Sequence, residues 1–274
     1  MNKYVLLLLI SAAAIIYNIF FAEPAKTATL RVGVECDHLP YNWEETSPTE
    51  TNFPLKNASG LYAEGYDIQM AALAAEEIGA NIEFYKIHFD SLIDALNNNE
   101  IDAIFSGMVD TAERKKLINF TIPYEERRVE YGLLVQKNSP YAEAGSLSDL
   151  SGARIAAQTS SRFDEVIDQI PGVRHLPPLE TQAEIVKALL ASEIDATVLN
   201  VDTAQSYARR NKTLAAVKFP EGKGFDLGFT GLCAGVRKSD KKLLSGINEA
   251  IEKIPLRQRQ RIMDMSVIRA GDKL

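Results

Sequence analysis

Apolar runs and helical periodicities alternate along most of the chain. Short apolar or β-branched runs predict strands at residues 30–35, 81–87, 103–106, 131–136, 154–158, 196–199, 215–219 and 231–236. Apolar residues at helical spacing predict helices at residues 66–78, 90–98, 111–118, 162–169, 182–192, 202–210, 240–254 and 257–265. This alternation predicts an α/β fold with mainly parallel sheets. Residues 44–61 are rich in Ser, Thr, Asn and Pro without a period, which predicts a surface loop.

The first 28 residues have the features of a targeting segment. Residues 4–22 carry no charge, and Glu23 and Pro24 end the run. The run is longer than a usual secretory hydrophobic region and close to the length of a membrane-spanning helix. A cleaved signal peptide is the favoured interpretation, and an uncleaved N-terminal anchor is the alternative. Both place the rest of the chain outside the cytoplasm.

One internal repeat indicates two similar lobes. Residues 95–103 read ALNNNEIDA and residues 188–196 read ALLASEIDA, each after a predicted helix and leading into a predicted strand. Chance similarity of one helix–turn–strand unit is the alternative. In two such lobes, loops 106–110 and 200–202 would follow strands at the carboxyl edge of a sheet, where open α/β sheets bind ligands. We therefore expect a ligand between the lobes, with closure about a hinge.

Composition and charge exclude several classes of function. Among 274 residues, 30 Lys and Arg stand against 37 Asp and Glu, and the net charge of −7 argues against a nucleic-acid partner. Two cysteines are too few for a disulfide scaffold or a Cys-rich zinc module, and the three histidines have no metal-ligand spacing. The sequence has no nucleophile elbow, P-loop or dinucleotide-binding glycine motif. We therefore expect no catalytic residue, metal or cofactor.

Arg114 is the leading candidate for ligand binding. It lies in the first turn of a helix that begins after Thr111, where a guanidinium and free backbone N–H groups can bind a carboxylate. The alternative is a local ion pair with Asp110 or another nearby acid on a solvated face. Ser160 and Ser161 lie between a strand and a helix, so they could contact a polar ligand group or simply cap the helix.

Four aromatic residues could form an apolar or stacking wall of the site, although ordinary core packing is the alternative for each. They are His38, Tyr41, Trp43 and Phe89.

Several motifs, in this order and spacing, resemble one protein family. They are GYDI at 65–68, LIDAL at 92–96, IDAI at 101–104, SGM at 106–108, Thr111-x-x-Arg114, NFTIPY at 119–124 and the start of a second lobe at 152–159. Together they resemble family 3 of the bacterial extracellular solute-binding proteins, the periplasmic polar amino-acid receptors of ABC importers. The resemblance covers about residues 29–268.

The resemblance implies a type II periplasmic-binding-protein fold, with two mainly parallel sheets joined by two hinge strands. Lobe 1 would comprise residues 29–134 and 230–274, and lobe 2 residues 135–229. The chain would be a monomer that captures a small carboxylate-bearing solute, most simply a polar amino acid or derivative, without catalysis or a cofactor. It would deliver the solute to an ABC importer permease and touch the membrane only through its N-terminal segment. In this fold Cys36 and Cys233 would lie on strands that are not neighbours, which favours free buried thiols over a disulfide.

By position, the resemblance also implies a set of ligand contacts. Arg114, in the helix that Thr111 begins, would hold the α-carboxylate. The remaining contacts would be the lobe-1 loop residues Ser106, Gly107 and Met108, the flanking aromatic residues His38 and Phe89, and the lobe-2 residues Ser160 and Ser161.

Asn200 departs from the family's pattern. It stands where the family usually has an acid that pairs with the ligand ammonium, and an ammonium buried without a counter-charge is costly. Either another acid replaces the missing one, or the ligand is an amino-acid derivative or another small carboxylate. The acids that could replace it are Glu35, Asp110 and Asp202. Val109, in place of a hydroxyl, and Arg162, in place of a small residue, are further departures.

Two rival functions stay open. One is a membrane-anchored receptor that senses the ligand, which needs an intact N-terminal helix. The other is an enzyme on the same fold, because cyclohexadienyl dehydratases resemble these receptors. An enzyme needs a carboxylate acid or base in the cleft, for which Glu35 and Asp202 are the candidates.

Overall fold

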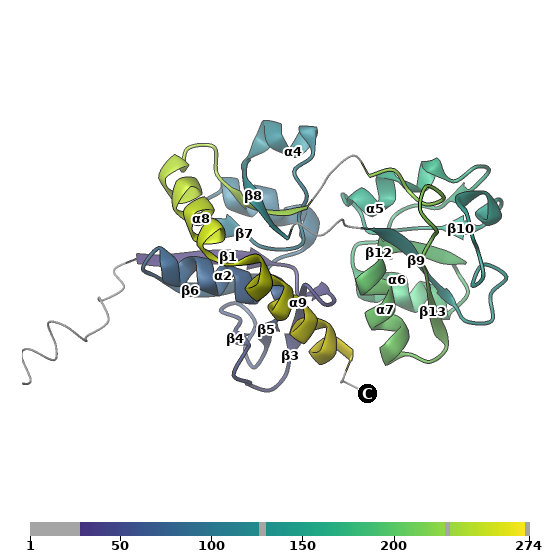
Figure 1. Ribbon diagram of the computed structural model, residues 1–274, viewed down its shortest axis with the longest axis horizontal. Coiled ribbons are helices and arrows are strands. Elements are labelled where there is room, and N and C mark those ends of the chain that lie inside the picture. Colours follow the sequence, from purple (N-terminus) through teal and green to yellow (C-terminus); the bar gives the residue numbers. More distant parts are fainter. Residues whose placement is uncertain (1–27, 126–129, 228–230, 272–274) are drawn as a thin grey trace, which may run out of the picture.

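The computed structural model describes residues 28–125, 130–227 and 231–271 (Figure 1). Apart from Ala28, the expected targeting segment lies outside the described residues. The links between the two halves of the structure, residues 126–129 and 228–230, also lie outside them, so the expected hinge strands stay a prediction. Within the described ranges, no helix combines the length and the hydrophobicity that a bilayer crossing requires.

Two five-stranded sheets form the centres of two lobes, which stand side by side in Figure 1. Lobe 1 has the strand order β6 (Ala80–Lys86), β1 (Ala28–Val34), β7 (Ala103–Ile104), β14 (Leu232–Val236) and β8 (Asn119–Glu125). Lobe 2 has the order β11 (Arg174–His175), β10 (Arg154–Ile155), β12 (Ala196–Asn200), β9 (Tyr131–Gln136) and β13 (Leu214–Val217). In each sheet the fourth strand runs antiparallel to both neighbours, and the other strands share one direction. The predicted α/β fold with mainly parallel sheets is confirmed.

The predicted helices are also present. Lobe 1 contains α2 (Tyr66–Glu77), η1 (Phe89–Ser91), α3 (Leu92–Asn97), α4 (Ala112–Leu117), α8 (Lys241–Lys253) and α9 (Leu256–Gly271). Lobe 2 contains η2 (Leu147–Leu150), α5 (Arg162–Glu165), η3 (Ile167–Gln169), α6 (Gln182–Leu190) and α7 (Val201–Arg210). Two predicted helices are each divided into an α-helix and a 3-10 turn. The C-terminal helix α9 packs against α7, so it connects lobe 1 to lobe 2.

The internal repeat builds the same ion pair into both lobes. Asp102 precedes β7, and its carboxylate accepts hydrogen bonds from the backbone N–H and the guanidinium of Arg31 in β1. Asp195 precedes β12 and accepts the equivalent bonds from Arg154 in β10. The shortest N–O distances are 2.9 and 2.7 Å. Matching strand orders and matching ion pairs argue against chance similarity of the two segments.

Residues 44–61 are not a plain surface loop. A third sheet has the order β2 (Asp37–His38), β3 (Asn42–Glu45), β5 (Tyr62–Glu64) and β4 (Phe53–Pro54), so the expected loop contains strand residues. These strands have two to four residues, which is too short for an alternating pattern to be visible.

Two strands of the main sheets were also absent from the sequence prediction. β8 contains Pro123, which cannot donate to a strand ladder and is tolerated here because β8 lies at the edge of its sheet. β11 has only two residues and also lies at an edge.

The expected boundary between the lobes is wrong by several residues. From Tyr131 to Gln136, β9 pairs with β12 and β13, so the whole strand belongs to lobe 2 and is not divided after residue 134. Its ladder on both sides and its buried residues from Tyr131 to Val135 tie it to that core. Lobe 1 resumes with β14.

The two thiols agree with the interpretation favoured from the sequence. Cys36 follows β1, Cys233 lies in β14, and β7 separates these strands in the sheet. Both cysteines are free and buried.

Gly65, just before α2, lies close against the backbone of Tyr41, and a substitution can test this close approach. Its φ is 129°, and a Cβ would lie 2.3 Å from the Tyr41 carbonyl oxygen. Gly60 also has a positive φ, but no atom lies within 4 Å of its Cβ position. We expect Gly60→Ala to lower the free energy of unfolding by about 1–2 kcal/mol, and Gly65→Ala by clearly more, because only Gly65→Ala must displace backbone. Urea unfolding measures both, and equal losses would contradict the described packing.

Candidate functional site

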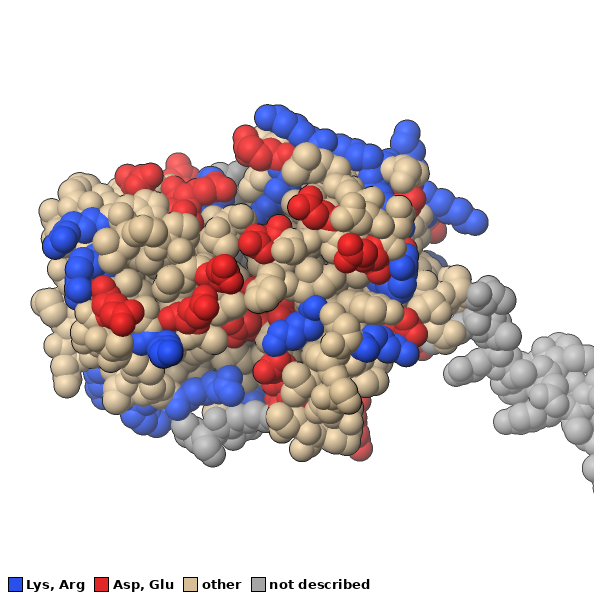
Figure 2. Space-filling view, turned by 180° about the vertical axis from the view of Figure 1, so that it is seen from behind, with Lys and Arg blue, Asp and Glu red and all other residues tan. Residues whose placement is uncertain are grey.

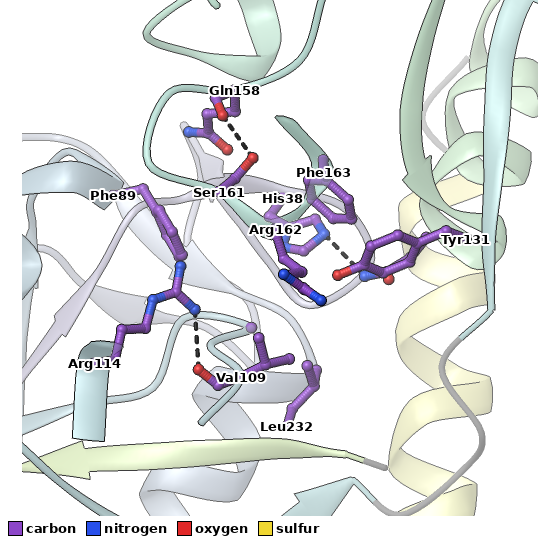
Figure 3. A pocket seen from close by; sticks show the side chains of 12 residues that line it. His38, Phe89, Val109, Arg114, Tyr131, Gln158, Ser161, Arg162, Phe163 and Leu232 are labelled. Atoms are coloured by element: carbon purple, nitrogen blue, oxygen red, sulfur yellow. Dashed lines mark hydrogen bonds between the residues drawn. The ribbon is translucent and has the colours of Figure 1, made fainter. Parts of the chain in front are cut away.

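A pocket between the lobes takes half of its lining from each (Figure 3). The space among these side chains measures about 370 Å³, including the part open to solvent. Lobe 1 contributes His38, Phe89, Gly107, Val109, Arg114 and Leu232, and lobe 2 contributes Tyr131, Gln158, Ser161, Arg162, Phe163 and Asn200. The pocket therefore lies where the loops after β7 and β12 meet, at the position expected for a ligand.

Arg114 is anchored to both lobes. The Thr111 hydroxyl caps α4 by accepting a hydrogen bond from the Arg114 backbone N–H at 3.2 Å. The guanidinium donates from Nη1 to the Val109 carbonyl in lobe 1 and from Nη2 to the Ser160 carbonyl in lobe 2, both at 3.0 Å. Its Cζ lies 5.3 Å from the centre of the Phe89 ring, as Figure 3 illustrates. These contacts hold a cation across the cleft.

The charge of Arg114 has no ion-pair partner among the described residues. The expected alternative pairing with Asp110 is wrong, because Asp110 pairs with Lys115 at 2.5 Å. Arg162, the second guanidinium of the pocket, pairs with Glu165. Burial lowers the pKa of Arg114, which reflects the cost of a desolvated charge. An anionic group of a solute would find one uncompensated cation here.

The lobe-1 loop contributes less of the pocket than expected. Gly107 lines it, and a Cβ at Gly107 would come within 2.8 Å of His38 Nδ1. Ser106 instead accepts a hydrogen bond from the Glu35 backbone N–H at 3.0 Å, and the Met108 side chain packs in the core of lobe 1. Neither side chain is among the lining residues, so the expectation that both contact the ligand is not supported. Successive side chains of this loop point in opposite directions. Val109, rather than Met108, therefore lines the pocket beside Gly107.

The lobe-2 loop has a mixed role. Ser161 lines the pocket, but its hydroxyl also donates to the Gln158 carbonyl at 2.6 Å and accepts from the Asp164 N–H, so it caps α5. Ser160 has a φ of 57° and presents its carbonyl, rather than its hydroxyl, to Arg114. Ser161 therefore stays a candidate ligand contact, whereas Ser160 does not line the pocket and binds Arg114 through its backbone.

Two of the four candidate aromatic residues line the pocket, and two lie in the core. His38 lies 4.9 Å from Tyr41 and 5.8 Å from Phe163, measured between ring centres. Burial lowers the pKa of His38 to about 4, so the ring is neutral at neutral pH. Tyr41 and Trp43 are buried in hydrophobic clusters and do not line the pocket.

Asn200 is buried at the end of β12, with 3% of its surface exposed. Its side-chain Nδ2 donates to His38 Nε2 at 3.3 Å, which places the ring hydrogen of His38 on Nδ1. Its Oδ1 has no hydrogen-bond partner in the part of the chain that the structure describes. A buried acceptor without a donor is costly, so this atom is suited to a donor on a solute.

None of the three acids considered as replacements lines the pocket. Asp110 is paired, as above, and Asp202 lies in the first turn of α7. Glu35 lies behind Gln158, whose Nε2 donates to the Glu35 carboxyl group. Glu35 instead lines a neighbouring, more open space of about 850 Å³, together with Asp37.

Asp37 adds another contact between the lobes. Its carboxylate accepts a hydrogen bond from the backbone N–H of Ala183, at the start of α6, at 2.9 Å. In the described ranges, no group of three or more His, Cys, Asp or Glu residues is arranged to hold a metal ion.

Several lining residues were not among the predicted contacts. Tyr131 and Leu232 begin β9 and β14, the strands next to the links between the lobes. Phe163 and Arg162 begin α5 directly after the predicted serines. Of these four residues, only Arg162 and Phe163 could have been predicted from the sequence, because the start of their helix was already expected to face the ligand.

Comparison with known proteins gives one family. The profile of "Bacterial extracellular solute-binding proteins, family 3" matches residues 30–264. The "Arginine-binding extracellular protein ArtP" of Bacillus subtilis is 24% identical over 262 residues, which cover 93% of this chain and 93% of that protein. The "ABC transporter arginine-binding protein 1" of Escherichia coli is 30% identical over 193 residues, 69% of this chain and 75% of that protein.

A solved structure agrees with this grouping. An amino acid ABC transporter substrate-binding protein from Streptococcus pneumoniae, bound to L-arginine, has a TM-score of 0.73 and 25% sequence identity. The match covers 88% of this chain and 94% of that one. The expected two-lobed, type II periplasmic-binding-protein fold is therefore confirmed.

Glu35 makes the stability of the folded protein depend on pH. Burial, and next the charge of Asp37, raise the pKa of Glu35 from 4.5 to about 8. Between these values the folded protein holds a proton that the unfolded chain has released, so stability falls as the pH rises. We expect a loss of about 1 kcal/mol between about pH 7 and about pH 8.

Denaturant unfolding at both pH values measures this loss. Glu35→Gln should remove it, because an amide keeps the shape and carries no titratable proton, while Glu100→Gln at an exposed position should leave it unchanged. A Glu35→Gln variant with the same decline as the wild type would contradict the assignment.

Proposed function

Because the chain belongs to family 3 of the bacterial extracellular solute-binding proteins, we propose that it captures a small carboxylate-bearing solute between its lobes and delivers it to an ABC importer. An amino acid or a derivative of one is the solute class that fits the family. The relatives include arginine-binding proteins of Bacillus subtilis and Escherichia coli, which supports an amino acid as the solute class. The importer's permease is the expected partner.

The observation that carries this proposal is the position of Arg114. A guanidinium without an acidic partner in the described residues lies in a pocket that both lobes line equally. A carboxylate can accept two parallel hydrogen bonds from such a group. Because Ser160 belongs to lobe 2, the same side chain also contacts the opposite lobe, so solute capture and lobe closure are coupled.

We propose that the protein binds its solute without converting it and acts as a monomer. The lining residues of the described chain include no carboxylate that could serve as the acid or base of a dehydratase. Figure 2 shows Lys and Arg intermingled with Asp and Glu over one face, rather than gathered into one basic area that would suit nucleic acid.

We propose that the chain acts in the periplasm after its N-terminal segment is removed. This follows from the extracellular family and from the uncharged run at residues 4–22. The intact mass of protein recovered from the export compartment should correspond to the chain without residues 1–22. A mass that includes the whole segment would instead support the membrane-anchored receptor.

A thermal-shift screen of residues 29–274 would identify the solute class. Amino acids, their derivatives and small mono- and dicarboxylates form the panel. A ligand at 100 times its Kd stabilises the folded state by about 2.7 kcal/mol, enough for a visible shift in Tm.

Arg114→Ala tests the binding site directly. It should weaken the best ligand of the screen by about 2–5 kcal/mol, because it leaves the ligand carboxylate buried and unpaired. Lys116→Ala, an exposed cation on the same helix, is the matched control and should leave the affinity unchanged. Titration calorimetry measures both, and an Arg114→Ala variant with wild-type affinity would rule out this site.

A further inference from the structure

The charges of the lining residues limit the net charge of the solute, which membership of the family alone does not do. The described lining residues carry two guanidinium groups and no carboxylate. Glu165 pairs with Arg162, so its charge is already matched, although it also acts on Arg114 at longer range. The pocket therefore has an excess of one positive charge, at Arg114. A bound group restores neutrality only if it carries a net charge of about −1.

A zwitterionic amino acid does not meet this condition. Its carboxylate would neutralise Arg114, but its ammonium would then need a second negative charge inside the pocket. A buried ammonium without such a partner loses its hydration and gains only dipoles in return. Glu35, Asp110 and Asp202, the acids considered above as replacements, do not line the pocket.

Asn200 indicates what replaces the ammonium. This lobe-2 residue lines the same pocket as Arg114 and is 3% exposed, and its Oδ1 is a buried acceptor without a partner in the described chain. Its Nδ2 is already committed to His38 Nε2. A neutral N–H or O–H on the solute would satisfy Oδ1 without adding charge.

We infer that the solute is an anion without a free ammonium group, whose carboxylate binds Arg114 and whose neutral N–H or O–H donates to Asn200. This inference rests on the proposed function. N-acylated amino acids and 2-hydroxy acids share this chemistry. In the first the donor is an amide N–H, and in the second it is a hydroxyl.

Matched probes test the inference. The panel holds L-glutamine, L-asparagine and L-leucine, each with its Nα-acetyl and its 2-hydroxy counterpart, so that each amino acid is a zwitterion and each counterpart carries a net charge of −1. Titration calorimetry with the wild-type protein should give at least about tenfold tighter binding for a counterpart than for its free amino acid. The two series distinguish an amide donor from a hydroxyl donor, and tighter binding of either series supports the inference.

Asn200→Asp should reverse the preference. A carboxylate at this position supplies the missing counter-charge, so free amino acids should gain about tenfold or more and the ammonium-free counterparts should lose affinity. Asn97→Asp adds the same charge at an exposed position of α3 and should leave the preference unchanged. The wild-type comparison decides the question even if Asn200→Asp does not fold.

The failures of the two proposals can be told apart. Wild-type protein that binds a free amino acid at least as tightly as its counterparts overturns the inference and leaves the proposed function standing. If no member of the panel binds either protein, the inference and the proposed function both fail.

Discussion

A buried guanidinium loses its hydration and needs negative partners in return, and much of the arrangement between the lobes meets this need at Arg114. Two backbone carbonyls, one from each lobe, supply partial negative charge, and the Phe89 ring lies alongside. The carbonyls do not neutralise the cation. The positive charge of Arg114 is therefore left without a negative charge beside it in the described chain, and a solute anion can supply that charge.

The two lobes are variations on one design. They share the strand order, the single reversed strand and an Asp–Arg ion pair that joins the second strand of each sheet to the turn before the third. The same design places one loop of each lobe at the shared cleft. The loops then differ in chemistry. Lobe 1 provides the unpaired cation of Arg114 and a glycine that lets His38 approach, whereas lobe 2 provides amide and hydroxyl groups and the paired guanidinium of Arg162.

The sequence predicted the helices and most strands of the main sheets, because these elements follow from hydrophobic periodicity. It predicted the position of the candidate site, because the repeated segment at residues 95–103 and 188–196 indicated two similar lobes. It did not predict the third sheet, whose strands are too short to show a period, nor the edge strand interrupted by Pro123. Arg114 was predictable from its place in a helical first turn. The inward or outward direction of Ser106 and Met108 was not, because it depends on a loop that turns by single residues.

The order of the strands along the chain has a consequence for how the protein is made. Every strand of the lobe-2 sheet lies within one continuous stretch, from Tyr131 to Val217, so that sheet can be completed locally. The lobe-1 sheet cannot, because β8 pairs only with β14, which follows the whole of lobe 2 in sequence. During synthesis and export from the N-terminus, the first lobe to emerge is the last to finish. Until residues 232–236 arrive, its β7 edge remains open, and such unpaired edges are the surfaces that invite aggregation and chaperone binding.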